Sequence, residues 1–391
     1  MNSEAFDAIF ERIHRLGPLP FDVVVEAALY GPGGFFTKGA GAGRGADFIT
    51  SPEVGPLFGA VVGSFLDEAW TSLDRPDPFF MVEAGAGRGA LATSVLAAKP
   101  QCLKALRYIC VERSQALRDR IESDLPVEPA SNVFGVGSDD DELSPVLTGK
   151  GPDGRGAFVE QGPIVTLLDD LPPGPFPGVV LANELLDNLA FLLLERVGPG
   201  PSGWAEVRVG LSGDESSLVE VLVDASSDLC TQAEHFAPDA SVGARLPLQV
   251  GAQEWLHQAL STIENGRLVI IDYADQSPSL AARPCQEWLR TYRAHERGGH
   301  PLADFGNQDI TCEVAIDQLA RVRPPDHDTS QADWLRLRGL DDHVVAAKKT
   351  WHERAAIGDL EAMKARSRVN EAEALTDPSG LGAFRVLEWV I

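Results

Sequence analysis

Alternating glycines at residues 83–91 form the pattern in this chain with the clearest chemical meaning. Four apolar residues lead to Glu83, and Gly85, Gly87 and Gly89 follow at every second position. Glycines so placed let a ligand approach bare backbone, and the helix predicted after them supplies free N–H groups. The pattern predicts the first strand–turn–helix unit of a nucleotide-binding, doubly wound fold.

Two cofactors fit this turn. Gly85, Gly87 and Ala90 satisfy the dinucleotide fingerprint, whose last position accepts alanine. The same segment satisfies the acid-x-Gly-x-Gly-x-Gly pattern of S-adenosylmethionine (SAM) sites, with Glu83 as the acid. A carboxylate at the turn would repel a pyrophosphate but tolerates the cationic groups of SAM. Glu83 therefore favours SAM, and a glycine turn without a ligand stays a third interpretation.

A second cofactor contact is predicted at the end of the next strand, residues 107–112. Its last residue, Glu112, is an acid 23 positions after Gly89. An acid at the end of this strand can bind two ribose hydroxyls, in NAD and SAM sites alike. A solvated strand-end acid is the alternative.

The segments around these motifs predict an α/β protein. Alternation of apolar and polar residues over 204–224 predicts an inserted β-hairpin. The predicted helices cover 3–16, 20–30, 53–73 and 251–264, with a helical region over 311–366. The further predicted strands cover 165–168, 177–182, 266–273 and 383–390.

Composition argues against several classes of function. The 391 residues carry a net charge of −25, which repels phosphate backbones and anionic membranes and so disfavours a nucleic-acid substrate. Five cysteines without short spacing predict neither a disulfide framework nor a zinc site. We therefore expect no bound metal, and we expect the protein to lie in a reducing cytoplasm. Acidic residues near the N-terminus argue against a signal or transit peptide, and no apolar run reaches membrane-spanning length. The preference for Arg over Lys suggests a bacterial source.

Taken in order, these segments resemble the MidA-like family of SAM-dependent methyltransferases, whose mitochondrial members act in the assembly of respiratory complex I. The resemblance extends from about residue 20 to 388. The segments that carry it are 45–53, 57–59, 83–89, 111–114, 182–187, 271–273, 290–295 and 306–311.

Three positions depart from the family pattern. Ala46 stands where the family usually has glycine before Asp47. Ala190 replaces the proline of an Asp-x-x-Pro motif that begins at Asp187, and Ala274 replaces a glycine. The last two departures flank the expected acceptor side of the pocket.

The resemblance implies a doubly wound, Rossmann-like methyltransferase sheet with an N-terminal helical cap and an inserted β-hairpin and helical region. We expect the cap and a cofactor-covering loop over residues 1–75 and the methyltransferase domain over 76–391. Within that domain the insertion is expected at about 200–265 and the helical region at about 280–366.

The resemblance also implies SAM as the cofactor. We assign the glycine turn to its amino-acid part, with Glu83 ordering the turn, and Glu112 to its ribose. Asp169, after the third strand, is a candidate for the adenine amine, and a plain loop acid is equally open. The N-terminal loop is expected to fold over the cofactor. The predicted cofactor contacts are Asp47, Thr50, Pro52, Glu83, Gly85, Gly87, Gly89, Glu112 and Asp169.

Asn183 and Glu184 follow the fourth strand, at the edge where α/β sheets place reacting groups. The resemblance implies arginine methylation of a protein partner, a respiratory complex I subunit, so Glu184 is expected to pair with a guanidinium. Asp187 is expected one helical turn on, as a second carboxylate on the same face. Glu184 as an ordinary salt-bridge partner is the alternative.

Two other functions stay open. A SAM-binding assembly protein without transfer activity fits the departures at Ala190 and Ala274. An NAD-linked oxidoreductase fits the dinucleotide fingerprint. The sequence leaves the methyl acceptor, the degree of methylation and the oligomeric state undetermined.

Overall fold

A computed structural model describes residues 3–39, 50–134, 162–293 and 296–391. The chain forms two compact units, between which it passes several times. Unit 1 comprises Met1–Phe48, Glu184–His257 and Asp272–Pro324. Unit 2 comprises Ile49–Asn183, Gln258–Ile271 and Pro325–Ile391.

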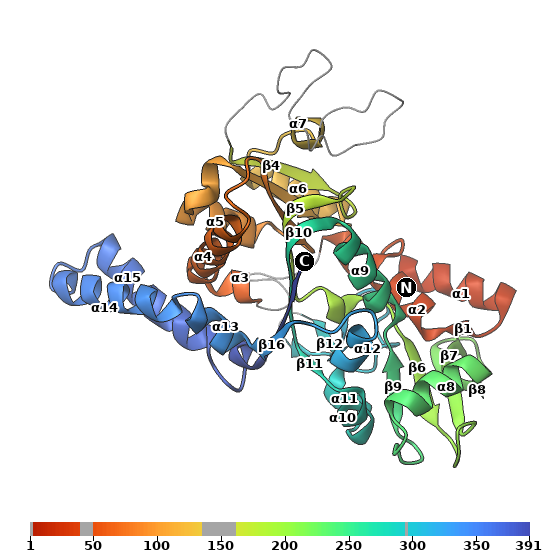
Figure 1. The fold of residues 1–391 in the computed structure, drawn as a ribbon. Coiled ribbons are helices and arrows are strands. Elements are labelled where there is room, and N and C mark those ends of the chain that lie inside the picture. The colour runs from red at the N-terminus through yellow and green to blue at the C-terminus, as the bar shows by residue number, and fades with distance from the viewer. Residues whose placement is uncertain (1–2, 40–49, 135–161, 294–295) are drawn as a thin grey trace. The chain divides into compact units, whose positions relative to one another are not determined.

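Unit 2 is built on a sheet of seven described strands (Figure 1). The strands are β2 (Phe79–Ala84), β3 (Leu106–Val111), β4 (Ile164–Leu168), β5 (Phe176–Asn183), β10 (Ile263–Asp272), β16 (His327–Ser330) and β17 (Arg385–Val390). Their order is β16-β17-β10-β5-β2-β3-β4. The pairs from β10 to β4 are all parallel, and β16 is antiparallel to β17. The order of the chain reverses between β2 and β5, and open α/β sheets bind ligands at such a point.

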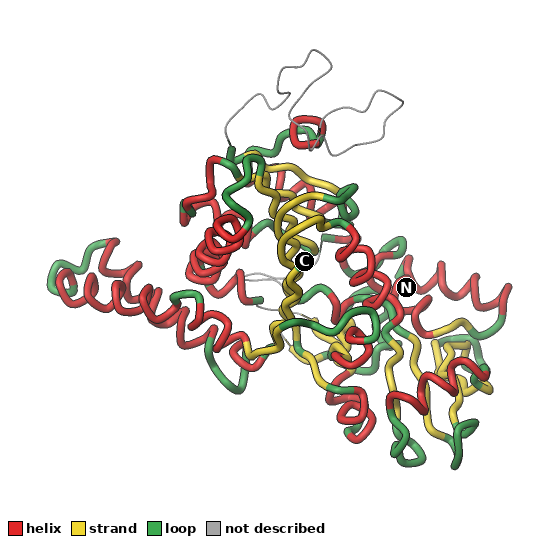
Figure 2. The backbone as a smooth tube through the Cα atoms, in the orientation of Figure 1, coloured by secondary structure: helices red, strands yellow, loops and turns green. Residues whose placement is uncertain are grey.

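The central strands are apolar because both faces of the sheet are covered. Every residue of β2 and β3 is buried, and Phe80 contacts the rings of Phe134 and Phe176. Helices flank these strands in Figure 2. The helical segments of the first part of unit 2 are α3 (Ser51–Val54), α4 (Pro56–Ser72), α5 (Ala90–Ala98), η2 (Gln101–Lys104), α6 (Gln115–Asp124) and α7 (Ser131–Phe134).

A helical hairpin follows β16 in unit 2. It consists of α14 (Leu340–Arg354) and α15 (Leu360–Leu375), after α13 (Gln331–Leu337) and before η4 (Leu381–Ala383). Glu371 of α15 is buried and accepts a hydrogen bond from the Leu57 backbone N–H, at 2.9 Å, in the first turn of α4. Arg368 also donates to this carboxylate, at 2.8 Å. The hairpin is thus tied to α4 by one buried charge that satisfies a free helix N–H.

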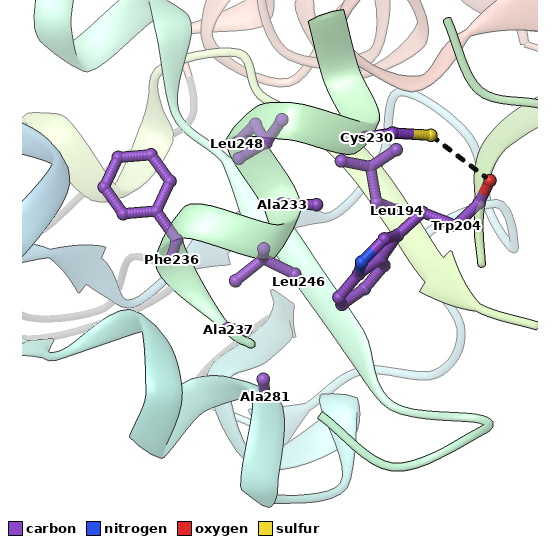
Figure 3. Packing of buried hydrophobic residues seen from close by; sticks show 9 residues of the cluster. All are labelled: Leu194, Trp204, Cys230, Ala233, Phe236, Ala237, Leu246, Leu248 and Ala281. Atoms are coloured by element: carbon purple, nitrogen blue, oxygen red, sulfur yellow. Dashed lines mark hydrogen bonds between the residues drawn. The ribbon is translucent and has the colours of Figure 1, made fainter. Parts of the chain in front are cut away.

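Unit 1 contains an antiparallel sheet with the predicted hairpin. The five strands are β1 (Leu19–Pro20), β6 (Leu192–Arg196), β7 (Trp204–Leu211), β8 (Leu218–Asp224) and β9 (Arg245–Leu248). Strands β7 and β8 pair from Ala205 with Asp224 to Leu211 with Leu218, which confirms the hairpin. Helix α8 (Ser227–Phe236) packs on this sheet through a buried cluster drawn in Figure 3, where the Cys230 thiol donates to the Trp204 carbonyl.

The rest of unit 1 is formed by short elements. The helices are α1 (Glu4–Leu16), α2 (Phe21–Tyr30), η1 (Phe36–Lys38), η3 (Leu186–Asn188), α9 (Val250–Ser261, whose last turn belongs to unit 2), α10 (Ser277–Ala282), α11 (Cys285–Trp288) and α12 (Ile316–Ala320). The strands are β11 (Ala274–Asp275), β12 (Leu289–Arg293), β13 (Glu296–Arg297), β14 (Asp309–Cys312) and β15 (Val314–Ala315). The helices predicted over 3–16 and 20–30 are present.

Two expectations differ from this architecture. The region expected to be helical, about 280–366, also contains β12 to β16, because β12 pairs with β14 across an intervening loop that local patterns do not reveal. The units also divide the chain differently from the expected boundary at residue 75, since residues 49–75 group with the sheet of unit 2. No helix in the described part of the chain is long and apolar enough to cross a membrane.

Replacement of the buried Glu371 tests the link between α15 and α4. Glu371→Ala leaves the Leu57 N–H without its acceptor and should lower the free energy of unfolding by about 1–3 kcal/mol. Urea denaturation measures the change. Glu373→Ala removes an exposed acid from the same helix and should change stability by less than about 0.5 kcal/mol. Equal effects of the two variants would contradict this role of Glu371.

Candidate functional site

The glycine turn after β2 needs glycine at all three positions. Gly85, Gly87 and Gly89 have φ angles of 73°, 56° and 75°, which side chains rarely adopt. The Gly85 N–H donates to the Val111 carbonyl at 2.9 Å and ties the turn to the end of β3. A Cβ at Gly89 would lie 3.3 Å from Ile121 of α6, whereas one at Gly87 would meet nothing within 4 Å. The turn is therefore packed at Gly89 and open to a ligand at Gly87.

Glu112 lies directly beside this turn. Its Oε2 accepts from the Gly87 N–H at 2.9 Å, and its Oε1 accepts from the Ser114 N–H at 2.8 Å. Burial raises the pKa of Glu112, while these two bonds and the charges of Arg118 and Arg113 oppose that shift. A carboxylate has about four acceptor positions, so each oxygen keeps capacity for a ribose hydroxyl.

Glu83 is directed into the protein. It is 5 % exposed, accepts from the Tyr108 hydroxyl at 2.7 Å and interacts with the Ala92 N–H in the first turn of α5. Burial raises the pKa of Glu83 to about 8, so the group is protonated at pH 7. A protonated Glu83 repels a pyrophosphate less than a charged one, so its raised pKa weakens the sequence argument from charge. Its bonds join β2, β3 and α5, the elements that carry the turn.

The other predicted cofactor contacts are placed in part. Asp47 lies outside the described residues. Thr50 is buried and precedes α3, whose first turn contains Pro52, and its carbonyl accepts from the Glu53 N–H at 2.9 Å. Asp169 is exposed and follows Leu168, whose carbonyl accepts the Glu112 N–H at 2.9 Å. Asp169 thus continues the strand that pairs with the end of β3.

The chain turns sharply after β5. Asn183 ends the strand and pairs with Ile271 of β10. Glu184 follows with a φ of 51°, a left-handed conformation that costs a residue other than glycine about 1–3 kcal/mol. The Tyr273 hydroxyl donates to its carboxylate at 3.3 Å. Such strain at a strand end is typical of functional residues.

Asp187 lies in η3, and Glu184 lies outside that turn, so the two acids do not share a helix face as expected. The side chain of Asp187 is 2 % exposed, and its Oδ1 has no hydrogen-bond partner among the described residues. Burial and the charges of Asp272, Asp309 and Glu184 raise its pKa well above the ordinary value. Burial and these neighbouring charges therefore favour the protonated form of Asp187, and one of its oxygens is still able to bind.

Sequence reasoning missed the residues that surround Asp187. Asp272 and Asp309 are each 1 % exposed, and Asn188 donates to Asp309 at 2.9 Å. Asp272 ends a predicted parallel strand beside the one that ends at Asn183, and that common edge was an available signal. Asp309 belongs to the pairing of β12 and β14, which has no local signal. Among the described residues, no group of three or more His, Cys, Asp or Glu side chains is arranged to hold a metal ion.

Comparisons with known proteins identify the family. Residues 61–329 match the model of a family of S-adenosyl-L-methionine-dependent methyltransferases. Relatives named protein arginine methyltransferase NDUFAF7, mitochondrial, include the human protein, 28% identical over 80% of this chain and 67% of its own length, and the Danio rerio protein, 26% identical over 88% and 78%. The Drosophila melanogaster homolog is 26% identical over 78% of this chain and 66% of its own length. This chain thus matches about two thirds of the human and Drosophila relatives.

Two solved structures have the same fold. A protein from Burkholderia thailandensis, bound to S-adenosyl-homocysteine, has a TM-score of 0.77, with 23% identity over 99% of this chain and 92% of that chain. A second structure from that organism has a TM-score of 0.74, with 22% identity over 99% and 91%. These likenesses confirm the doubly wound methyltransferase fold. The family match confirms SAM over NAD and disfavours the oxidoreductase.

The protonation of Glu83 predicts a pH dependence of stability. Its pKa is about 8 in the folded protein and 4.5 in the unfolded chain, so only the folded state holds this proton between those values. The stabilisation is complete below pH 4.5 and is lost as pH rises to 8, at up to about 1.4 kcal/mol per pH unit.

Glu83→Gln keeps the shape of the neutral acid and removes its titration. In urea denaturation from pH 5 to 8, the variant should therefore gain stability relative to the wild type as pH rises. Glu122→Gln, an exposed change on α6, should follow the wild type at every pH. A constant difference between Glu83→Gln and the wild type would show that Glu83 is ionised throughout.

Proposed function

The chain belongs to the family of S-adenosyl-L-methionine-dependent methyltransferases, and we propose that it methylates arginine side chains of a protein. The observation that carries this proposal is Glu184, a strained and half-buried carboxylate at the end of β5 that receives the Tyr273 hydroxyl. The names of the relatives support arginine as the acceptor. A respiratory complex I subunit as the substrate and a location in bacterial cytoplasm stay predictions, and the relatives' own names state a mitochondrial location.

The residues beside the turn fit SAM. The open backbone at Gly87 suits the amino-acid part, together with Gly85 and Gly89, and the remaining acceptor capacity of Glu112 suits the ribose hydroxyls. When bound, SAM supplies a methyl group on a sulfonium, which is a good leaving group. The proposal keeps Asp169 for the adenine amine and Asp47, Thr50 and Pro52 for the covering loop. Glu83 supports the turn indirectly, through its hydrogen bond with the Tyr108 hydroxyl.

Arginine makes specific demands on the acceptor side. A guanidinium stays protonated, with a pKa above about 12, and presents five N–H donors in one plane. The Glu184 carboxylate can bind two of them and hold the reacting nitrogen, which must lie about 3–3.5 Å from the methyl carbon. As the N–C bond forms and the C–S bond breaks, that nitrogen loses a proton, which Glu184 can accept. Asn183 and Asp187 complete the predicted acceptor residues.

The assignment of Glu112 predicts a loss of SAM affinity. Glu112→Ala should weaken SAM binding at least tenfold, about 1.4 kcal/mol, because the ribose hydroxyls lose their acceptor. Calorimetric titration of the cofactor-stripped protein measures the affinity. Asp119→Ala, an exposed change on α6, should bind SAM as the wild type does. Wild-type affinity in Glu112→Ala would remove Glu112 from the cofactor site.

The assignment of Glu184 predicts a loss of transfer without a loss of cofactor. Glu184→Gln should lower the rate of methyl transfer at least 100-fold, about 2.7 kcal/mol, and change SAM affinity less than twofold. The assay follows methyl-labelled SAM into proteins of a cell extract, with methylarginine identified after hydrolysis. Glu254→Gln, an exposed change on α9, is the control.

The same assay separates the competing functions. Label in another amino acid would correct the acceptor. SAM binding without any S-adenosylhomocysteine would support an assembly protein that has lost transfer chemistry.

A further inference from the structure

Asp272, at the end of β10, is a buried carboxylate that the proposed function leaves without a role. It is 1 % exposed, and both of its oxygens accept backbone hydrogen bonds. Oδ2 accepts from the N–H groups of Leu186 and Asp187, at 3.0 and 3.2 Å. Oδ1 accepts from the N–H of Tyr273, at 2.9 Å. One side chain thus ties the turn after Glu184 to the residue that carries the Tyr273 hydroxyl.

These bonds fix Glu184 from two directions. The Leu186 and Asp187 bonds hold the backbone immediately after Glu184, whose φ of 51° is costly and persists only where neighbouring contacts determine it. The Tyr273 bond holds the backbone that aims the tyrosine hydroxyl at the Glu184 carboxylate, 3.3 Å away. Without Asp272, the turn after Glu184 and the backbone of Tyr273 both lose these hydrogen bonds.

The position requires two acceptor oxygens, which an aspartate supplies and an asparagine does not. The acidic groups that interact with it are Glu184, Asp187, the thiol of Cys312 and the hydroxyl of Tyr273. Burial and the charge of Glu184 raise the pKa of Asp272, while its three N–H donors lower it. Asp187 has an oxygen without a donor, so we assign the proton of this pair to Asp187 and the charge to Asp272.

We propose that Asp272 is a positioning residue for methyl transfer, which acts by holding Glu184 in its left-handed conformation toward the acceptor. This inference rests on the role of Glu184 in the proposed function. It assigns no contact between Asp272 and the substrate. Tyr273 serves the same purpose through its hydroxyl.

Asp272→Asn tests this role with nearly unchanged volume. Total transfer of label from SAM to extract proteins should fall at least tenfold, with kcat affected more than KM for the extract, and SAM affinity should stay within twofold. Asp275→Asn, three residues further on in β11, should transfer as the wild type does, because that side chain contacts Arg283 and Ser279 instead.

A double variant separates positioning from a general loss of stability. In the Glu184→Gln background, Asp272→Asn should lower transfer less than twofold, since the group that it positions is already gone. An equal fold-loss in both backgrounds would overturn the proposal. Tyr273→Phe removes the hydroxyl without leaving a backbone N–H unpaired. It should also lower transfer in the wild type but less than twofold in the Glu184→Gln background, a pattern that we call masking, even if Asp272→Asn fails to fold.

The readouts also distinguish this inference from the proposed function. Total label reports the positioning of Glu184 whatever residue is methylated, and the methylarginine fraction reports the acceptor. Label outside arginine together with masking would retain the inference and correct the acceptor. Methylarginine without masking would retain arginine as the acceptor and overturn the positioning role of Asp272. A wild-type chain that transfers no label would overturn both the inference and the proposed function.

Discussion

The register in which β5 pairs with its parallel neighbours β2 and β10 is the constraint on which the candidate site depends. Gly178 of β5 lies so close to β2 that a Cβ there would be 2.1 Å from the Phe80 carbonyl oxygen, and a Cβ at Gly266 of β10 would be 1.8 Å from that of Gly178. A residue other than glycine at either position would therefore overlap the neighbouring strand in this register. The fixed register aligns Ala84 with Ala182 and Ile271 with Asn183, so β2, β5 and β10 end along one edge.

Backbone donors at these strand ends oppose the effect of burial on the acids. Glu112 and Asp272 each accept backbone N–H bonds on both oxygens, and these bonds counteract the rise in pKa that burial causes. Glu83 and Asp187 are also buried, Asp187 has an oxygen without a donor, and burial raises the pKa of Glu83 to about 8 and that of Asp187 well above its ordinary value, so the protonated forms are favoured. The two carboxylates that accept backbone hydrogen bonds on both oxygens thus lie where the backbone turns.

The sequence was sufficient to predict those features that depend on residues close together in the chain. The glycine turn, the acid that directly follows β3 and the hairpin of β7 and β8 are present as predicted, because each depends on residues that are close in the chain. The sequence was not sufficient where burial or distant pairing decides. It gave no sign that Glu83 is neutral, that Glu184 adopts a left-handed conformation, or that Asp309 reaches Asn188.

Ala274 and Ala190 depart from the family pattern near the acceptor side, and the backbone accommodates both of them. Ala274 replaces a glycine, but it lies in the extended strand β11 opposite Val314, where no left-handed conformation is needed. Ala190 replaces a proline. Its carbonyl oxygen would lie only 2.8 Å from a Cβ at Gly251, so the glycine in α9 allows the backbone at Ala190 to approach this helix closely. Between these two positions Asp272 still accepts its three N–H bonds. The hydrogen bonds that hold the turn after Glu184 are therefore formed in the presence of both alanines.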